Sequence, residues 1–285
     1  MGLLSGLGNL GLGKLENLQI FEDKTKVKGE EVEEPVKVEE KDFLFDKSYV
    51  CPVCDNNFKE KTVRAGRVRS AGSDSDLRPR YENIDVLKYD TVCCMKCGYS
   101  GLTRYFASLS SMQSKLIREY ISSDFKPGQI IGQAMEFITY EEAISRHKLC
   151  LANAIVKRGK ESEKAYICLK TAWVIRGMRE SLDREAEDYK QKNDQALAQE
   201  EEFLKTAYDG FIKARAKEAY PLAGMDEATV DFLLSVLAMR FDQDDVALRM
   251  LSNIIVSRSA SNRIKDRARL VKDELMKKKR DRKDA

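Results

Sequence analysis

Two cysteine pairs decide how the middle of this chain folds: Cys51-Pro52-Val53-Cys54 and Cys94-Met95-Lys96-Cys97-Gly98. In each pair, a two-residue spacer lets a tight turn direct both thiolates to one point, and Gly98 can take the positive φ that such a turn often needs. Two such turns supply four sulfur ligands and leave no position for a catalytic water. We therefore predict a metal site with Cys51, Cys54, Cys94 and Cys97 as its ligands.

Zinc is the metal that we expect, one ion per chain, and iron is the alternative because a rubredoxin site has the same donors. Cys93 competes with Cys94 for the ligand position, since adjacent residues of an extended run face opposite ways. The two-residue spacing to Cys97 favours Cys94. Cys93 is then expected to be a small buried apolar residue. The alternative hypothesis is that Cys93 has a redox role or replaces one of the ligands. Cys150 and Cys168 fall in helical patterns and are expected in the core.

The segment 42–102 is predicted to be a small β zinc ribbon with a basic loop inserted between its halves. Runs of β-branched and aromatic residues before each cysteine pair favour strands, including one over residues 84–92. The 39 residues between Cys54 and Cys94 exceed the usual ribbon spacing. The insertion, residues 64–81, is rich in Gly, Ser and Asp and reads as a loop with basic ends.

The loop carries local positive charge on a chain that is otherwise nearly neutral. Between Lys59 and Arg80, seven Lys and Arg oppose three Asp and Glu, which gives +4. Such a loop beside a zinc ribbon can contact phosphates. The candidate polyanion contacts are Arg64, Arg67, Arg69, Arg78 and Arg80. An equally good alternative pairs Arg78 and Arg80 with Asp74 and Asp76, or with the acidic linker, inside the molecule.

Residues 103–280 are predicted to be helical. Apolar stripes of helical period run through residues 106–121, 134–156, 165–182, 203–219, 230–240, 246–256 and 264–276, and a charged stretch at 180–202 interrupts them. One window resembles a tetratricopeptide-like helix–turn–helix, with Leu234, Ser235, Ala238, Ala247 and Leu251 in register. A plain antiparallel bundle is the alternative. Residues 281–285 are expected to form a charged tail.

The first 41 residues are predicted to lie outside these domains. Residues 1–21 combine five glycines with leucines at helix-like intervals, a composition that does not favour a stable isolated helix. Residues 22–41 read as a charged, acidic linker. We expect residues 1–21 to be a docking segment for a protein surface. Weak contact with a membrane surface and a tail without a role are the alternatives.

Composition places the chain among soluble proteins. Its 285 residues carry 50 Lys and Arg against 47 Asp and Glu, a net charge of +3, and 34% of residues are charged. The mean hydropathy is −0.48, and no apolar run approaches the length of a bilayer span. The chain begins without a basic, apolar leader, so we expect a cytoplasmic protein whose cysteines serve a metal and not disulfides.

The ribbon motifs resemble those of a bacterial family known as domain of unknown function 2225. The resemblance rests on both cysteine pairs and on the residues between them: Phe58, Val63, Arg69, Asp74-Ser75-Asp76-Leu77, Tyr81, Asp85, Tyr89 and Tyr99. It covers about residues 42–275 and implies an N-terminal zinc ribbon followed by tetratricopeptide-like helices. Asp85-Val86 and Cys93 depart from the family pattern. The resemblance implies an architecture and no established activity.

The expected fold class is therefore α+β, mostly α, and the expected function is that of a non-enzymatic adaptor or scaffold. Phosphate-binding loops and nucleophile elbows are absent from the sequence. The single histidine, His147, lies among charged residues and is expected at the surface. We expect a protein or peptide partner. A nucleic-acid-associated ribbon protein is the second hypothesis, and a redox or metal-dependent enzyme is the third.

Overall fold

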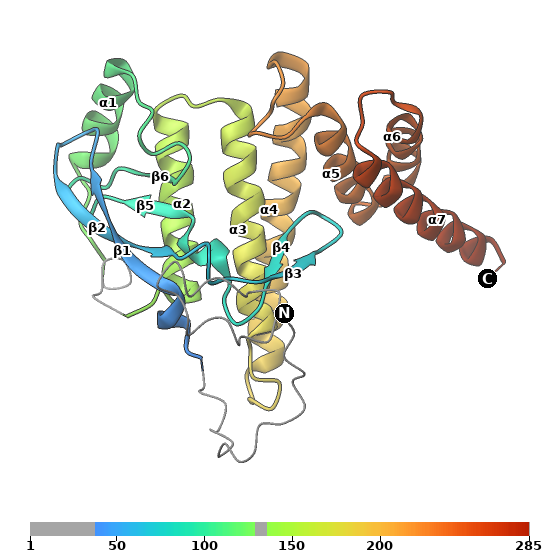
Figure 1. The fold of residues 1–285 in the computed structure, drawn as a ribbon, viewed down its shortest axis with the longest axis horizontal. Coiled ribbons are helices and arrows are strands. Elements are labelled where there is room, and N and C mark those ends of the chain that lie inside the picture. The colour runs from blue at the N-terminus through green and yellow to red at the C-terminus, as the bar shows by residue number, and fades with distance from the viewer. Residues whose placement is uncertain (1–37, 129–135, 285) are drawn as a thin grey trace, which may run out of the picture. The chain divides into compact units, whose positions relative to one another are not determined.

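The computed structural model describes residues 38–128 and 136–284 (Figure 1). Residues from Glu39 onward form one compact unit. The predicted docking segment 1–21 and nearly all of the linker 22–41 lie outside the described residues, as does the start of the predicted helical stripe 134–156. The unit is mostly helical with small antiparallel sheets near its start, so the predicted α+β class is confirmed.

Three antiparallel hairpins make up the strand region. Strand β1 (Leu44–Val50) pairs with β2 (Asn57–Val63), and β5 (Thr91–Cys93) pairs with β6 (Ser100–Leu102). Each of these two hairpins carries one cysteine pair in its connecting turn. The third hairpin, β3 (Ser70–Ser73) with β4 (Pro79–Tyr81), folds the predicted loop insertion. The insertion is thus a structured arm and not an irregular loop.

The predicted strand over residues 84–92 is wrong for most of its length. A short 3-10 helix, η4 (Val86–Tyr89), occupies its middle, and only its end enters β5. Asp85 explains the difference, because its carboxylate accepts a hydrogen bond from the Leu87 amide at 3.1 Å. A side chain that caps the local backbone offers an alternative to strand pairing. A similar 3-10 helix, η3 (Glu40–Phe43), precedes β1.

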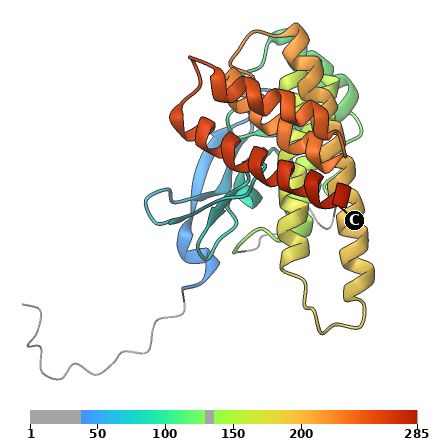
Figure 2. The same ribbon diagram turned by 90° about the vertical axis from the view of Figure 1, so that its right-hand side faces the viewer.

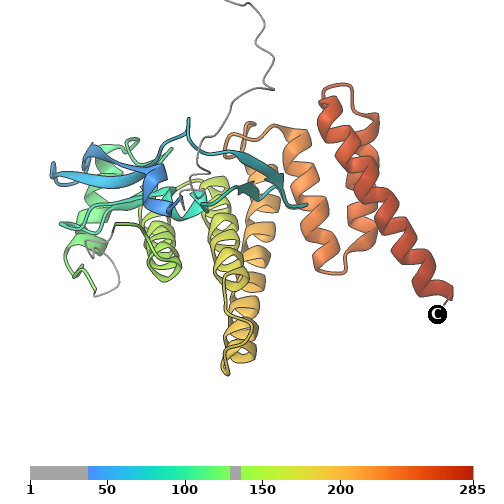
Figure 3. The same cartoon turned by 60° about the horizontal axis from the view of Figure 1, so that its bottom comes forward.

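The helices follow in chain order: α1 (Ser111–Ile117), the π-helical turn η5 (Arg118–Ser122), α2 (Tyr140–Val156), α3 (Glu161–Glu180), α4 (Tyr189–Lys217), α5 (Glu227–Arg240), α6 (Asp244–Val256) and α7 (Asn262–Asp284). Helices α2, α3 and α4 form a layer, and the strands lie against one face of it (Figures 1 and 3). Ribbon and helices share one core, which includes Leu44 and Leu87 from the ribbon and Leu169 and Leu204 from the helices. The central helix α3 is buried along most of its length, because it is covered on several sides.

Helix α4 begins well inside the charged stretch 180–202, so the predicted interruption is shorter than expected. Most of the charged residues in this stretch are exposed, but one of them lies on the buried face of α4. That residue is Glu200, whose side chain is fully buried between Arg176, Arg179 and Arg240. Pattern analysis assigns a charged residue to the solvent-exposed face of a helix, although a charged residue with an ion-pair partner can lie on the buried face.

Helices α5, α6 and α7 pack together at the C-terminal end (Figure 2). The five positions of the predicted repeat window, from Leu234 to Leu251, are all fully buried where these helices meet. The turn between α5 and α6 lies at residues 241–243, between the predicted apolar stripes 230–240 and 246–256. A tetratricopeptide-like repeat stays a prediction. In the described part of the chain, no helix is long and apolar enough to cross a membrane.

Candidate metal centre and the ionic network beside it

The two cysteine turns have the same backbone geometry. The amide of Asp55 donates to the Cys51 carbonyl, and the Cys51 amide donates to the Asn56 carbonyl, both at 2.9 Å. In the second turn, the Gly98 amide donates to the Cys94 carbonyl and the Cys94 amide donates to the Tyr99 carbonyl, both at 2.8 Å. The fifth residue of each turn takes a left-handed φ, 56° at Asp55 and 73° at Gly98.

These turns bring the four predicted ligands together. The ligand atoms of Cys51, Cys54, Cys94 and Cys97 all lie within 4.8 Å of one another, and this group can hold a metal ion. The Sγ atoms of Cys51 and Cys97 are 3.5 Å apart, and those of Cys54 and Cys94 are 3.6 Å apart. An ideal tetrahedron with metal–sulfur bonds of about 2.3 Å has sulfur–sulfur edges of about 3.8 Å. The sulfur positions fit such a shell.

Cys93 lies outside the four-sulfur group. Its Sγ is 2.7 Å from the Ser100 hydroxyl, which is in turn 2.9 Å from Cys150 Sγ. Both thiols are buried, as expected from the sequence. The hydrogen bonds of the two turns explain why Cys94, and not Cys93, joins the four-sulfur group. Cys94 holds the position in the second turn that Cys51 holds in the first.

The thiols are poorly suited to ionise together without a cation. The hydrogen bond with Cys94, together with burial, raises the pKa of Cys51 to about 12. Hydrogen bonds from Cys51 and Cys94 raise the pKa of Cys97 as well, while the bond from Cys51 lowers the pKa of Cys94. One thiolate is thus stabilised at the expense of its neighbours. A bound divalent cation removes this conflict, because it attracts all four thiolates.

Side chains from the helical region hold both turns by their carbonyl groups. Arg118 donates to the Val53 carbonyl from Nε and Nη2 at 2.8 and 2.6 Å. Ser122 donates to the Cys97 carbonyl at 2.8 Å, and Asn153 donates to the Gly98 carbonyl at 3.0 Å. Phe125 covers Gly98 so closely that an added Cβ would lie 2.5 Å from its ring. The centre therefore joins the ribbon to α2 and η5, and sequence spacing gave no signal for these partners.

The candidate polyanion contacts divide into two groups. Arg64, Arg67 and Arg69 are exposed in and beside the turn between β2 and β3. Arg64 donates to the Leu44 carbonyl at 3.0 Å, and Arg67 donates to the Asp42 carbonyl at 3.1 Å. Arg78 and Arg80 instead turn toward α3 and form ion pairs inside the molecule. The pairing with Asp74 that the sequence left open is present for both.

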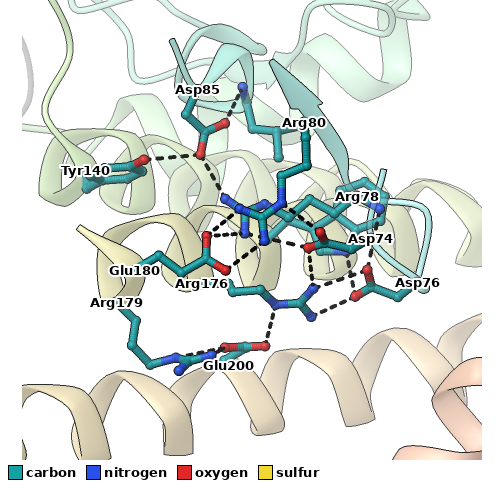
Figure 4. A network of polar contacts seen from close by, with 12 residues as sticks. Asp74, Asp76, Arg78, Arg80, Asp85, Tyr140, Arg176, Arg179, Glu180 and Glu200 are labelled. Carbon is teal, nitrogen blue, oxygen red and sulfur yellow. Dashed lines mark hydrogen bonds and ion pairs between the residues drawn. The ribbon is translucent and has the colours of Figure 1, made fainter. Parts of the chain in front are cut away.

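An ionic network fixes the β3–β4 hairpin to α3 (Figure 4). Arg176 on α3 contacts Asp76 at 2.7 Å, Asp74 at 3.1 Å and Glu200 at 2.7 Å. Trp173 adds an indole hydrogen bond to Asp76 at 3.0 Å. Every one of these groups has a partner of opposite charge or a hydrogen bond, as buried charges require.

Arg78 and Arg80 form the outer part of the same network, where both contact Glu180 at 2.9 and 2.7 Å. Arg78 is almost completely buried and also contacts Asp85 at 3.3 Å. Burial alone would raise the pKa of Glu180, but the hydrogen bond from Arg80 and the charge of Arg78 outweigh it and lower that pKa. The same balance lowers the pKa of Asp74, through Arg80 and Arg176. The pairs are therefore ionised at neutral pH.

The expectation that His147 lies at the surface is wrong. Its side chain is fully buried, and Nδ1 is 2.7 Å from the Ala143 carbonyl, so Nδ1 carries the proton. Burial lowers the pKa of His147 to about 4. His147 was expected at the surface because its neighbours in the sequence are charged, but Glu142 and Arg146 are themselves buried. Arg146 pairs with Glu60 of β2 at 2.8 Å.

A family model described as "Uncharacterized protein conserved in bacteria (DUF2225)" matches residues 44–275. The chain belongs to this family. The match spans the whole strand region and most of the helices, which confirms the resemblance drawn from the ribbon motifs. No curated protein and no solved structure matches the chain.

Proposed function

We propose that this family member is a non-enzymatic cytoplasmic adaptor, in which a structural zinc ion stabilises the ribbon and the helical layer binds a segment of a protein partner. The zinc assignment rests on four cysteine sulfurs at tetrahedral distances. Four protein ligands complete the usual zinc shell, so the metal would act on stability and not on a substrate. Iron would occupy the same donors, and visible absorption from an iron–thiolate centre distinguishes the two metals.

The binding role rests on one observation, an apolar groove in the helical layer. Its floor is formed by Ala165 and Cys168 of α3, and its walls include Leu151 and Ile155 of α2 and Gly210 of α4. The cavity volume is about 310 Å³, and Ile155 is 58% exposed. An exposed apolar side chain in a concave surface is typical of an interaction site.

The rim of the groove favours a peptide that carries charges of both signs. Glu161 and Lys164 lie on α3, and Asp209 and Lys213 lie on α4. Charged rims around apolar floors are typical of grooves that accept an amphipathic helix, because apolar anchors enter while polar groups stay in water. We therefore propose an amphipathic segment of a partner protein as the occupant.

The test is affinity capture from a lysate of the source bacterium with a matched pair of variants. Ile155→Asp places a charge in the groove, whereas Leu270→Asp places one at an exposed apolar position of α7, where Leu270 is 66% exposed. A partner that is retained by wild type and Leu270→Asp but lost by Ile155→Asp supports the proposal. Capture that is equal for all three proteins, or no specific capture, contradicts it.

A nucleic-acid role is the second candidate, supported by the exposed arginines near the β2–β3 turn. Arg69 has no carboxylate partner within the described residues, and Arg64 and Arg67 bond only to carbonyl oxygens there. Binding to phosphates would weaken steeply with salt. Electrophoretic mobility of DNA and RNA at several salt concentrations, with an Arg67→Gln and Arg69→Gln double variant, tests this role.

A further inference from the structure

A second pocket lies at the end of the helical layer, where three loops meet. It has a volume of about 460 Å³. The loop after β6 contributes Arg104 and Tyr105, the turn between α2 and α3 contributes residues 157–160, and the loop between α4 and α5 contributes Ala223 and Gly224. The size falls in the range of small-molecule sites, about 300–1,000 Å³.

The charges in this pocket are not balanced. Four cationic side chains line it, Arg104, Lys157, Arg158 and Lys160, together with one acid, Glu163. Glu163 forms an ion pair with Lys157, at 2.6 Å. Within residues 38–128 and 136–284, the other three cations have no carboxylate within ion-pair distance. Glu218 lies nearby, but its carboxylate accepts hydrogen bonds from the Ser162 amide and hydroxyl at 3.1 and 2.5 Å.

Arg104 is held in place before any ligand arrives. Its Nη1 donates to the Ala223 carbonyl at 2.5 Å, and its guanidinium lies 5.3 Å from the centre of the Tyr105 ring. Gly224 makes this position accessible, because it has a φ of +80° and an added Cβ would lie 2.3 Å from Nη2. A fixed guanidinium suits a phosphate, which it can bind through two parallel hydrogen bonds.

We propose that this pocket binds a small phosphorylated molecule, with its phosphate against Arg104, Arg158 and Lys160 and its less polar part beside Tyr105 and Pro221. The three unpaired cations supply the charge that a phosphate dianion needs, and the aromatic and proline surfaces accept a base or another apolar group. The site is separate from the groove on α2, α3 and α4, and the inference does not depend on the proposed adaptor role.

The test is calorimetric titration of the intact protein at constant ionic strength with inorganic phosphate, pyrophosphate and ATP, and with adenosine as the uncharged control. We expect at least one phosphate compound to bind with Kd of ~1 mM or tighter and adenosine not to bind. Phosphate and pyrophosphate alone would show that the anion suffices, whereas binding of ATP alone would show that the base is also needed. No binding by any of the three, or equal binding of adenosine, would overturn the proposal.

A matched pair of variants assigns the binding to this pocket. Arg158→Gly with Lys160→Gln removes two exposed cations, and glycine suits the Arg158 position because its φ is 54°. We expect this double variant to bind at least about 10-fold more weakly while its thermal transition is unchanged. Arg69→Gln removes an exposed arginine elsewhere and should bind like wild type. Equal weakening in both proteins would indicate unspecific attraction and contradict the proposal.

Discussion

The four-cysteine centre gathers groups that repel one another when ionised, whereas the ionic network gathers groups of opposite charge. Both fix the same ribbon to the helical region, the first through η5 and α2 and the second through α3. In the proposed function, the first depends on a bound metal ion. The second contains its own counter-charges, since Arg176 and Arg78 face the carboxylates that they neutralise. The two regions should therefore lose their structure under different conditions, and a change that disrupts one should leave the other folded.

The largest effect is expected from loss of the metal. Structural zinc contributes about 10 kcal/mol or more in small domains, so removing a ligand should unfold the cysteine turns. We expect Cys94→Ser to lose the metal by elemental analysis and to lose amide protection around residues 51–56 and 94–99. Emission from the single tryptophan, Trp173, which reports on the ionic network, should change little.

The matched control is Cys93→Ser, which replaces a buried thiol outside the four-sulfur group. It should keep the full metal content. If Cys93→Ser lost the metal while Cys94→Ser kept it, the ligand assignment would be wrong. If Cys94→Ser changed Trp173 emission as strongly as global unfolding does, the two regions would not be independent.

The next largest effect is expected at Arg176. Arg176→Met leaves Asp76 and Glu200 buried without the guanidinium, and breaking a buried pair in this way costs roughly 3–5 kcal/mol. Urea unfolding should show this loss, Trp173 emission should shift, and the metal content should stay unchanged.

Arg179→Met is the control, since Arg179 contacts the same Glu200 at 3.2 Å but is more exposed. It should cost only about 1 kcal/mol. Equal costs for both variants would show that the network does not depend on burial of Arg176.

Acid should lower the stability of the whole protein while the ionic network stays ionised. His147 determines how much stability is lost. Its folded-state pKa of about 4 lies below the ordinary value of 6.5, so the folded protein is most stable above pH 6.5 and loses stability as the pH falls toward 4. At 1.36 kcal/mol per pKa unit, the loss between pH 7 and pH 5 is about 2 kcal/mol. The charges nearby are those of Asp85, Asp90 and Lys170.

The measurement is urea unfolding of wild type and His147→Gln at pH 7, 6 and 5. The variant should lack this part of the pH dependence, so the difference between the two proteins should shrink as the pH falls. The ionic network should persist at pH 5, because the pKa values of Asp74 and Glu180 lie below their usual range. Parallel pH profiles would contradict the assignment to His147.

The smallest effect distinguishes the two cysteine turns. Gly98→Ala places a Cβ on a left-handed residue and against Phe125, which should cost about 1–2 kcal/mol in urea unfolding of the metal-bound protein. Asp55→Gly alters the matching position of the first turn, where the residue is exposed, and should change stability by no more than about 0.5 kcal/mol. Equal costs would mean that Phe125 does not restrict the second turn.

The four-cysteine cluster could be predicted from the sequence because its geometry is local. A two-residue spacer fixes where both thiolates of a turn point, and Gly98 marks the position that needs a left-handed φ. The break between α5 and α6 likewise lies where the predicted apolar stripes 230–240 and 246–256 leave a gap. Residues 84–92 were not predictable, since one capping side chain, Asp85, redirected a segment whose composition favours a strand.

What only the tertiary structure decided is the state of the charges. Arg78 and Glu180 are 102 residues apart in sequence, and Arg146 and Glu60 are 86 apart, so no local pattern shows that they meet. In a sequence, a run of charged residues predicts a solvated face. His147 was therefore expected at the surface, because its neighbours in the sequence are charged. A charge can be buried once its partner is buried with it, and the fold alone brings the partners together. The sequence therefore determined where a metal can bind, and the packing of distant segments determined which charges remain free to bind something else.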